Sequence, residues 1–313
     1  MGSGEGSSEG ALVSNSTVRE GQTFAGASRA VRYANFVKLP HTIFALPFAL
    51  VGVTLASYHA PVSYRVVGWV VLAFTAARFA AMGFNRIVDR AYDAANPRTA
   101  MREIPRGTMS VKEAKALVIA AVLLFELAAW NLNFFCYALS PFALAWVLSY
   151  SFTKRFTRWS HLVLGFGLGI APVGGYLAVT GAWSDPWWML VALAAAVTCW
   201  TGGFDILYAL QDIEFDRANG LHSLPAKVGA GRSLVIARGL HAMTVVLLAL
   251  VGAAAGEGRL YFVGVVVAAA LLAFEHTLVH EDDVSNVGRA FFTVNMALSS
   301  AFFAFVLVER VWR

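Results

Sequence analysis

Long apolar segments dominate this sequence and restrict it to one broad class of fold. Hydrophobic residues make up 58% of the 313 residues and charged residues 14%. An α-helix needs about 20 apolar residues to cross a bilayer, where its backbone must satisfy its own hydrogen bonds. The sequence therefore predicts an all-α integral membrane protein, a single bundle of nine transmembrane helices at residues 41–60, 66–85, 114–131, 134–152, 161–181, 186–208, 233–255, 260–279 and 289–308.

The polar connections between these segments are short, so one domain is expected over residues 29–313. Residues 1–28 are rich in Gly, Ser and Glu, a composition typical of a disordered tail. They contain no apolar core after a basic start, so a cleavable signal peptide is not expected.

Two acidic clusters, 123 positions apart, lie at the ends of apolar segments. The first contains Asn85, Asp89 and Asp93, and the second contains Asp212 and Asp216. Residues four apart lie about 40° apart around a helix, and stacked carboxylates repel unless a cation neutralises them. Hard cations prefer oxygen ligands and often share them with phosphate groups. The clusters therefore predict a metal–diphosphate site, against the alternative of two solvated helix ends.

A similar basic loop follows each cluster, which indicates an internal repeat of about four helices. The bundle is then expected to consist of two such repeats plus one helix. We expect basic side chains in and near these loops to bind phosphate oxygens: Arg98, Arg102, Lys154, Arg155 and Lys227. For Lys154 and Arg155, the alternative is an ordinary positive flank of a membrane helix.

Most of the 24 Lys and Arg lie near the N-terminus and in the connections after the second, fourth and sixth apolar segments. By the positive-inside rule, the N-terminus and both acidic clusters face the cytoplasm of a bacterial-type inner (plasma) membrane. The net charge of +5 then reflects this topology and an attraction for anions, and a nucleic-acid partner is not expected.

Arg78 lies deep within an apolar segment, seven residues before Asn85 and on the same helical face. Charged residues at membrane depth usually face the interior of a bundle. Arg78 could orient the carboxylate of a substrate, because its planar guanidinium binds carboxylates in a bidentate way. The alternative is a structural ion pair that locks two helices together.

Three further features have plainer interpretations. The glycines from Gly165 to Gly175 lack the spacing of a nucleotide-binding loop and indicate close helix packing or a kink. Cys136 and Cys199 are expected to be reduced packing residues. A second metal site is possible at Glu275, His276 and His280, but a capped helix end is favoured there.

From about residue 35 onward, the sequence resembles the UbiA superfamily of intramembrane prenyltransferases. The resemblance rests on Lys38-Leu-Pro-His41-Thr42, on both acidic clusters, on Asn96-Pro-Arg-Thr99, on Thr153-Lys-Arg155 and on the stretch 205–229. It implies that Asn85, Asp89, Asp93, Asp212 and Asp216 bind Mg²⁺ and a polyprenyl diphosphate, with the four aspartates as catalytic residues.

The resemblance also implies the reaction, in which an aromatic acid attacks an allylic cation inside the bilayer as pyrophosphate leaves. The first cluster matches best the members that prenylate 4-hydroxybenzoate for ubiquinone. Residues 274–283 are more similar to a branch that prenylates dihydroxynaphthoate for menaquinone. Other acceptors of the superfamily, and an ion-coupled transporter, are the alternatives. The expected acceptor-binding residues are Arg78, His41, Tyr208 and Asp205.

Overall fold

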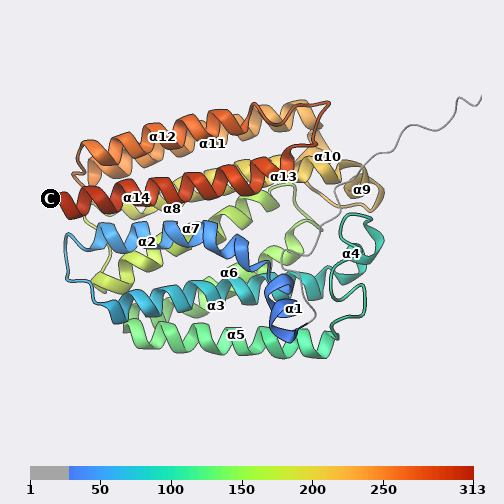
Figure 1. The fold of residues 1–313 in the computed structure, drawn as a ribbon, viewed down its shortest axis with the longest axis horizontal. Helices are drawn as coiled ribbons and strands as arrows, with labels where there is room; N and C mark the ends of the chain where they lie inside the picture. The colour runs from blue at the N-terminus through green and yellow to red at the C-terminus, as the bar shows by residue number, and fades with distance from the viewer. Residues whose placement is uncertain (1–27) are drawn as a thin grey trace, which may run out of the picture.

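The computed structural model describes residues 28–313 and, within that range, contains helices and no strand (Figure 1). The predicted tail, apart from Ser28, lies outside the described residues. The long helices are α2 (Leu39–Ala56), α3 (Tyr64–Val88), α5 (Val111–Leu132), α6 (Phe134–Thr153), α7 (Ser160–Thr180), α8 (Trp188–Ala209), α11 (Ala230–Ala254), α12 (Arg259–Glu275) and α14 (Asn295–Trp312). The short ones are α1 (Arg29–Phe36), α4 (Arg90–Ala95), η1 (Leu210–Asp212), α9 (Ile213–Ala218), α10 (Leu224–Val228), α13 (Val287–Arg289) and η2 (Ala290–Val294).

The all-α membrane class is confirmed, whereas the number of spans is not. In residues 28–313, seven helical stretches are long and apolar enough to cross a membrane. The other two expected segments, 41–60 and 260–279, correspond to α2 and α12. Among the described side chains, α2 contains a shorter apolar stretch at Ala45–Ala56, and α12 has 17 residues. Nine spans therefore stay a prediction.

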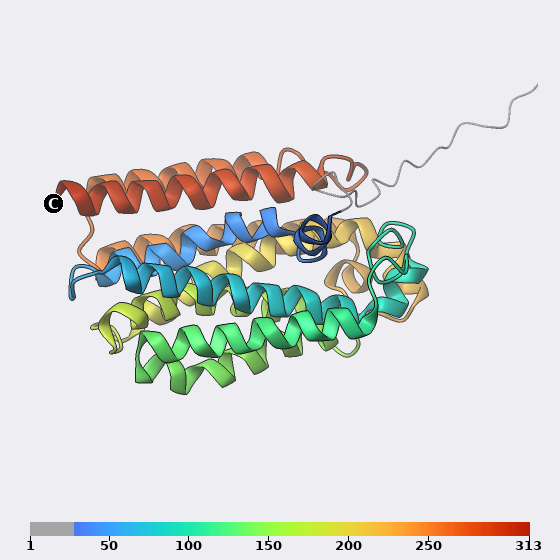
Figure 2. The same cartoon turned by 60° about the horizontal axis from the view of Figure 1, so that its bottom comes forward.

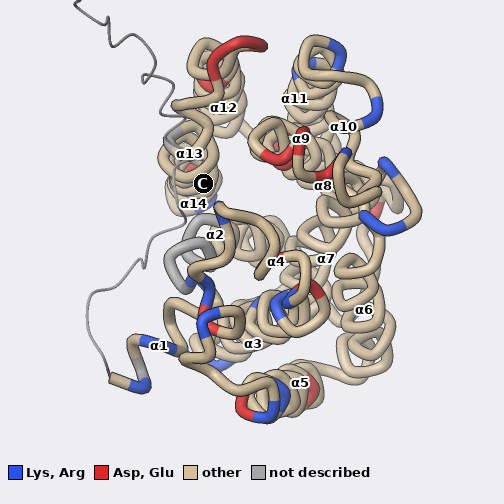
Figure 3. The backbone as a smooth tube through the Cα atoms, turned by 90° about the vertical axis from the view of Figure 1, so that its right-hand side faces the viewer, with Lys and Arg blue, Asp and Glu red and all other residues tan. Residues whose placement is uncertain are grey.

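The long helices pack in sequence order around a ring. Each of α5, α6, α7, α8, α11, α12 and α14 contacts the next one, α14 contacts α2, and α3 closes the ring between α2 and α5. In addition, α2 packs along α7, so this pair crosses the middle of the ring. In the end-on view of Figure 3, α2 lies between α14 and α3 on one side of the bundle, and α7 lies between α8 and α6 on the other.

Glycines allow α7 to approach both of its neighbours closely. A Cβ at Gly165 or Gly169 would overlap backbone oxygens of α8, those of Thr198 and Ala194, and a Cβ at Gly175 would overlap the Ala49 oxygen in α2. Small residues let the backbones of membrane helices meet in this way. The expectation of close packing at the glycine run is confirmed.

The largest apolar core lies between α2, α7, α8, α12 and α14. Trp200 and Phe302 are fully buried there, and Phe48 lies between them with ring centroids 4.7 and 5.9 Å away. In contrast, large apolar side chains of α5 and α6 face outward, as expected for a lipid-facing surface: Ile119, Leu123, Trp130, Phe134 and Phe142.

The short helices α4, α9 and α10 lie together at one end of the bundle, the end away from the C-terminus (Figures 1 and 2). They form the connections from α3 to α5 and from α8 to α11, which are the two connections that carry the acidic clusters. Consequently, segments far apart in sequence meet at this end, where acidic and basic residues gather (Figure 3).

We predict that Gly175→Ala destabilises the bundle by about 1–3 kcal/mol, because the new methyl group would overlap the Ala49 carbonyl and force α2 and α7 apart. Gly174→Ala is the matched control, since a Cβ there meets no atom within 4 Å. Thermal unfolding in detergent should show a lower Tm for Gly175→Ala alone. Equal Tm values for the two variants would contradict the role assigned to this crossing.

Candidate active site

The helix that carries each acidic cluster is interrupted at the first aspartate of that cluster. Asp89 has φ −91° and ψ 6°, and Asp212 has φ −107° and ψ 8°, so the two backbones turn in nearly the same way. The amide of Asp93 still donates to the Asp89 carbonyl at 2.8 Å, which keeps the one-turn spacing of the first cluster. The expected continuous helical faces are therefore interrupted, and Asp93 and Asp216 project from the short helices α4 and α9.

In the first cluster, each carboxylate has a basic or amide partner. Asn85 Nδ2 donates to Asp89 Oδ2 at 2.8 Å, and Arg155 Nη2 lies 3.3 Å from Asp89 Oδ1. Arg102 Nη1 lies 2.8 Å from Asp93 Oδ1. These pairs place the predicted phosphate-binding cations directly against the predicted metal ligands.

The second cluster is held by a residue of the first loop. Arg98 binds Asp212 in a bidentate way, with Nε 3.0 Å from Oδ1 and Nη2 2.6 Å from Oδ2. Asn96 Nδ2 donates to Asp212 Oδ1 at 3.1 Å, and Arg98 Nη1 donates to the Tyr208 hydroxyl at 2.8 Å. The loop after one acidic cluster thus neutralises Asp212 of the other cluster.

Both clusters line one polar pocket of about 160 Å³. Asp93 and Asp216 are 6% and 2% exposed, and Oδ2 of each is buried without a hydrogen-bond partner among the described residues. A buried carboxylate oxygen without a partner is unfavourable unless a ligand satisfies it. Asp93 and Asp216 both line the pocket, so each acidic cluster offers it one carboxylate with an unpartnered oxygen. A divalent cation that prefers oxygen ligands fits these two carboxylates.

The surroundings of Asp89 also favour a cation. Burial raises the pKa of this carboxyl above its ordinary value, and the nearby Asp93 carboxylate adds to the rise, while Arg155 opposes it. Among the side chains that the structure describes, no three His, Cys, Asp or Glu residues converge as a ready metal site, and arginines pair with Asp89, Asp93 and Asp212. Binding of a cation would therefore require these arginines to exchange partners.

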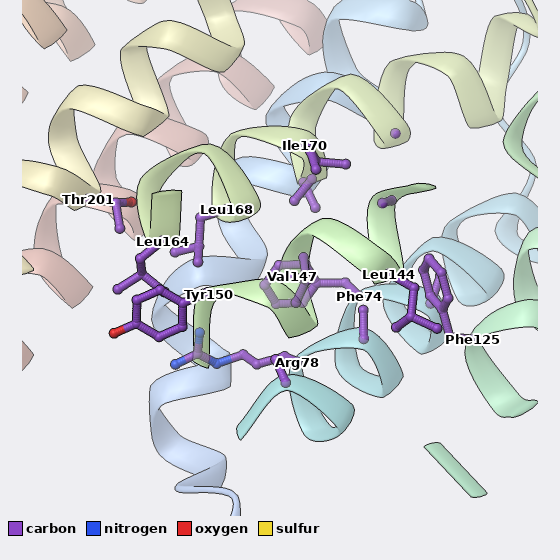
Figure 4. Close-up of a pocket in the computed structure, with 18 of the residues that line it drawn as sticks. Phe74, Arg78, Phe125, Leu144, Val147, Tyr150, Leu164, Leu168, Ile170 and Thr201 are labelled. Carbon is purple, nitrogen blue, oxygen red and sulfur yellow. The ribbon is translucent and has the colours of Figure 1, made fainter. Parts of the chain in front are cut away.

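An apolar cavity of about 360 Å³ adjoins the polar pocket. It extends between α3, α5, α6 and α7, with Phe125 and Leu144 at one end and Arg78 and Tyr150 at the other (Figure 4). The two cavities share part of their lining, namely Asn85, Arg102, Tyr150, Asp205 and Tyr208. A long apolar molecule with an anionic head can therefore occupy both at once.

The structure brings most of the sequence-predicted site residues together. The following line the polar pocket: Asn85, Asp89, Asp93, Arg98, Arg102, Lys154, Arg155, Asp205, Tyr208, Asp212 and Asp216. Arg78 lines the adjoining apolar cavity. Lys227 is exposed at the end of α10 and lies outside the linings of both cavities. The side chain of His41 is outside the described part of the chain.

Two residues that hold the site were not predicted. Asn96 supports Asp212, and His161 is buried with Nδ1 2.6 Å from Asp205 Oδ2. The position of His161 in the sequence does indicate a polar partner, because a histidine beside a long apolar segment usually has one. Its partner could not be read from the sequence, since it lies 44 residues away on another helix.

The favoured interpretation of residues 275–280 as a helix end agrees with the structure, since α12 ends at Glu275 and His276 is its C-cap. Glu275 is nevertheless fully buried, and it accepts a hydrogen bond from Asn295 Nδ2 at 2.8 Å. His276 Nε2 lies 3.0 Å from His241 Nδ1, whereas His280 is exposed. This polar network connects α11, α12 and α14.

Comparison with known proteins shows the family to which the chain belongs. The family model of the UbiA prenyltransferase family matches residues 45–303. The chain belongs to the UbiA prenyltransferase family. The predicted enzyme class, an aromatic prenyltransferase acting in a membrane, is thereby confirmed.

Several relatives have names that specify an acceptor. The 4-hydroxybenzoate octaprenyltransferase of Klebsiella pneumoniae is 32% identical over 234 residues, which cover 72% of this chain and 79% of that protein. That of Cronobacter sakazakii is 31% identical over 231 residues, 72% of this chain and 78% of the relative.

Solved structures of UbiA homologues share the fold. The apo structure of a UbiA homologue from Aeropyrum pernix K1 matches with a TM-score of 0.79 and 33% sequence identity. The match covers 86% of this chain and 98% of the homologue's chain. A UbiA homologue of Archaeoglobus fulgidus bound to GPP and Mg²⁺ has a TM-score of 0.66 at 21% identity, covering 90% of this chain and 99% of its own.

We predict that Asp216→Asn weakens binding of Mn²⁺, a paramagnetic substitute for Mg²⁺, by roughly tenfold or more, because the variant loses a carboxylate ligand. Electron paramagnetic resonance of the purified protein with inorganic pyrophosphate measures the free Mn²⁺. Asp282→Asn, a change at an exposed residue outside the pocket, is the control. Unchanged binding in Asp216→Asn would rule out this carboxylate as a ligand.

Proposed function

We propose that this UbiA-family protein transfers a polyprenyl group from a polyprenyl diphosphate to a hydroxylated aromatic carboxylate of the 4-hydroxybenzoate type, in respiratory quinone biosynthesis. The observation that carries the proposal is that two cavities adjoin each other. The polar pocket is lined by acidic and basic side chains, and the other cavity is mostly apolar and contains Arg78. The names of the relatives support the same acceptor.

Mg²⁺ is the cofactor we propose, held by Asp93 and Asp216 through their buried oxygens and by Asp89, Asp212 and Asn85 beside them. When bound, it would neutralise charge on the diphosphate and so make pyrophosphate a better leaving group. The UbiA homologue of Archaeoglobus fulgidus that binds GPP together with Mg²⁺ supports this assignment.

The chain's own basic residues would bind the diphosphate. Arg102 and Arg155 now pair with Asp93 and Asp89, and Lys154 lines the same pocket. When a cation neutralises the aspartates, the two guanidinium groups can turn to phosphate oxygens, which suit their planar donors. The polyprenyl chain would lie in the apolar cavity, where water is excluded from the allylic cation.

Arg78 is the residue we assign to the acceptor carboxylate. It lines the apolar cavity, and its guanidinium lies at the same end as Tyr150, beside the junction with the polar pocket (Figure 4). A carboxylate in such a cavity needs a charged partner, because an unpaired buried carboxylate is unfavourable. Dihydroxynaphthoate also carries a carboxylate next to a hydroxylated ring, so it is the second acceptor to test.

We propose that the polar pocket opens towards the cytoplasm of a bacterial-type inner membrane. The connections at this end of the bundle carry most of the Lys and Arg of the chain, as the positive-inside rule requires of cytoplasmic connections. Soluble aromatic acids would then reach the pocket directly, and the polyprenyl diphosphate would enter from the bilayer.

A membrane assay tests the proposed function directly. Membranes that contain the protein are incubated with polyprenyl diphosphates of several lengths and a panel of aromatic acids, and product masses are recorded. We expect prenylated 4-hydroxybenzoate or dihydroxynaphthoate in the presence of Mg²⁺, no product in EDTA, and a loss of turnover by orders of magnitude in Asp212→Asn. Full activity in EDTA would disprove the metal assignment.

We predict that Arg78→Ala reduces affinity for carboxylated acceptors by more than a hundredfold, because removal of one partner of a buried ion pair costs about 3–5 kcal/mol. Affinity for a neutral phenol of similar shape should change little. Arg86→Ala is the control, since Arg86 is buried in the same helix but pairs with Glu103 at 2.7 Å. Equal losses for charged and neutral acceptors would indicate a structural role for Arg78.

We also predict that Ala at Arg102, Lys154 or Arg155 raises the KM for the polyprenyl diphosphate by about tenfold, with a smaller effect on the acceptor, because each change removes one charge from the phosphate site. Steady-state kinetics with each substrate varied in turn measure the two values. Lys112→Ala, at an exposed position outside the pocket, is the control. An effect confined to the aromatic substrate would contradict the assignment.

A further inference from the structure

Asp205 lies where the two cavities meet. It lines both the polar pocket and the apolar cavity, and its side chain is 14% exposed. Asp205 lies on α8, seven residues before Asp212 in the sequence. It is therefore not a member of the second acidic cluster, Asp212 and Asp216. A substrate ring in the apolar cavity that faced the diphosphate would therefore lie beside this carboxylate.

His161 holds one oxygen of Asp205. The histidine is 1% exposed, at the start of α7, and its Nδ1 lies 2.6 Å from Asp205 Oδ2. Among the described residues, no hydrogen bond engages Oδ1 of Asp205. One oxygen is thus fixed while the other is available to a ligand.

The second ring nitrogen determines which tautomer His161 adopts. The backbone N–H of Leu224 donates to Nε2 at 3.3 Å, so Nε2 must carry a lone pair. The ring proton is then on Nδ1, and Nδ1–H donates to Asp205 Oδ2. His161 is therefore the donor and the Asp205 side-chain oxygen the acceptor, and this arrangement resembles that of histidines oriented by a second hydrogen bond in other sites.

We propose that His161 is a positioning residue that holds Asp205 as the base for the proton lost by the acceptor ring. The proposal rests on the proposed prenyl transfer. In that reaction the C1–O bond to diphosphate breaks and a bond forms between C1 and a ring carbon. The proton on that carbon moves to Asp205 Oδ1, its C–H electron pair restores the aromatic ring, and the protonated Asp205 later releases the proton to water in the polar pocket.

The surroundings explain why Asp205 needs this support. Arg102 lines the same junction, and the aspartates proposed to hold the cation line the adjoining polar pocket, so an unrestrained carboxylate would be drawn towards positive charge. A carboxylate bound to a cation is a poor base. The charge-assisted hydrogen bond from Nδ1 keeps Asp205 at the junction instead. Through Leu224, the same imidazole also connects Asp205 to α10, which follows the second acidic cluster.

Two substitutions separate positioning from packing. The amide nitrogen of Asn can replace Nδ1 as a donor to Asp205, whereas Leu fills the space without a donor. We expect His161→Leu to lower kcat by roughly tenfold to a hundredfold, within the range of general base catalysis, and His161→Asn to recover most of it. The KM for the polyprenyl diphosphate should stay within about twofold in both, and His280→Leu, at an exposed position, should match the wild type.

An isotope effect distinguishes loss of the base from loss of fold. With 4-hydroxybenzoate deuterated beside its hydroxyl group, kcat of His161→Leu and of Asp205→Asn should show a primary isotope effect that is larger than in the wild type, because proton removal becomes rate-limiting. Equal kcat values for His161→Asn and His161→Leu, or the absence of this isotope effect in both variants, would overturn the proposal. If His161→Leu does not fold, His161→Gln replaces it, since its longer amide reaches towards Leu224 rather than Asp205.

The hydrogen bonding can also be tested without activity. In ¹⁵N-histidine-labelled protein, a resonance that disappears in His161→Asn should report protonated Nδ1 and unprotonated Nε2. Protonated Nε2 would overturn the proposal even if prenyl transfer is detected. If the tautomer is as described but the wild type forms no prenylated product with any acceptor, the proposed function fails while the His161–Asp205 pair stands.

Discussion

The bidentate pair of Arg98 and Asp212 is the interaction on which the site depends. It connects the loop after the first acidic cluster to the helix that carries the second, across 114 positions of sequence. Without it, Asp212 would be a buried charge with a single amide partner, Asn96. A lone buried carboxylate would also repel Asp89, Asp93 and Asp216 in the same pocket. The pair therefore permits two sets of carboxylates to share one cavity before any cation binds.

Two further arginines also pair with aspartates of the pocket, and their side chains are more exposed than that of Arg98. Arg102 pairs with Asp93 and Arg155 with Asp89, so three guanidinium groups neutralise three of the four aspartates, and within residues 28–313 no ion pair engages Asp216. Such a pocket is preorganised for a ligand that carries both signs of charge. A divalent cation together with a diphosphate satisfies this requirement, because each component can take over one half of an existing ion pair.

Much of this could be predicted from sequence because it depends on local patterns. Apolar length predicted the membrane helices, and the matched spacing of Asp89–Asp93 and Asp212–Asp216 predicted that two distant segments would form one site. The breaks at Asp89 and Asp212 could not be predicted, because a four-residue spacing is the same in a straight helix and in one that turns between residues. His161 with Asp205, and Glu275 with Asn295, depend on how α7, α8, α12 and α14 pack, which spacing alone does not determine. The exposed position of Lys227 likewise follows from the orientation of α10.

The crossing of α2 and α7 divides the ring into two parts that can change independently during evolution. On one side, α8, α12 and α14 enclose a core filled by large aromatic side chains, and on the other, α3, α5 and α6 surround a cavity. The glycine contacts of α7 fix the partition between them. Substitutions at cavity positions such as Ala77, Phe125 or Leu144 can therefore alter which substrates fit, while the filled half preserves folding. A lineage with this architecture can acquire new acceptors and chain lengths without first acquiring extra stability.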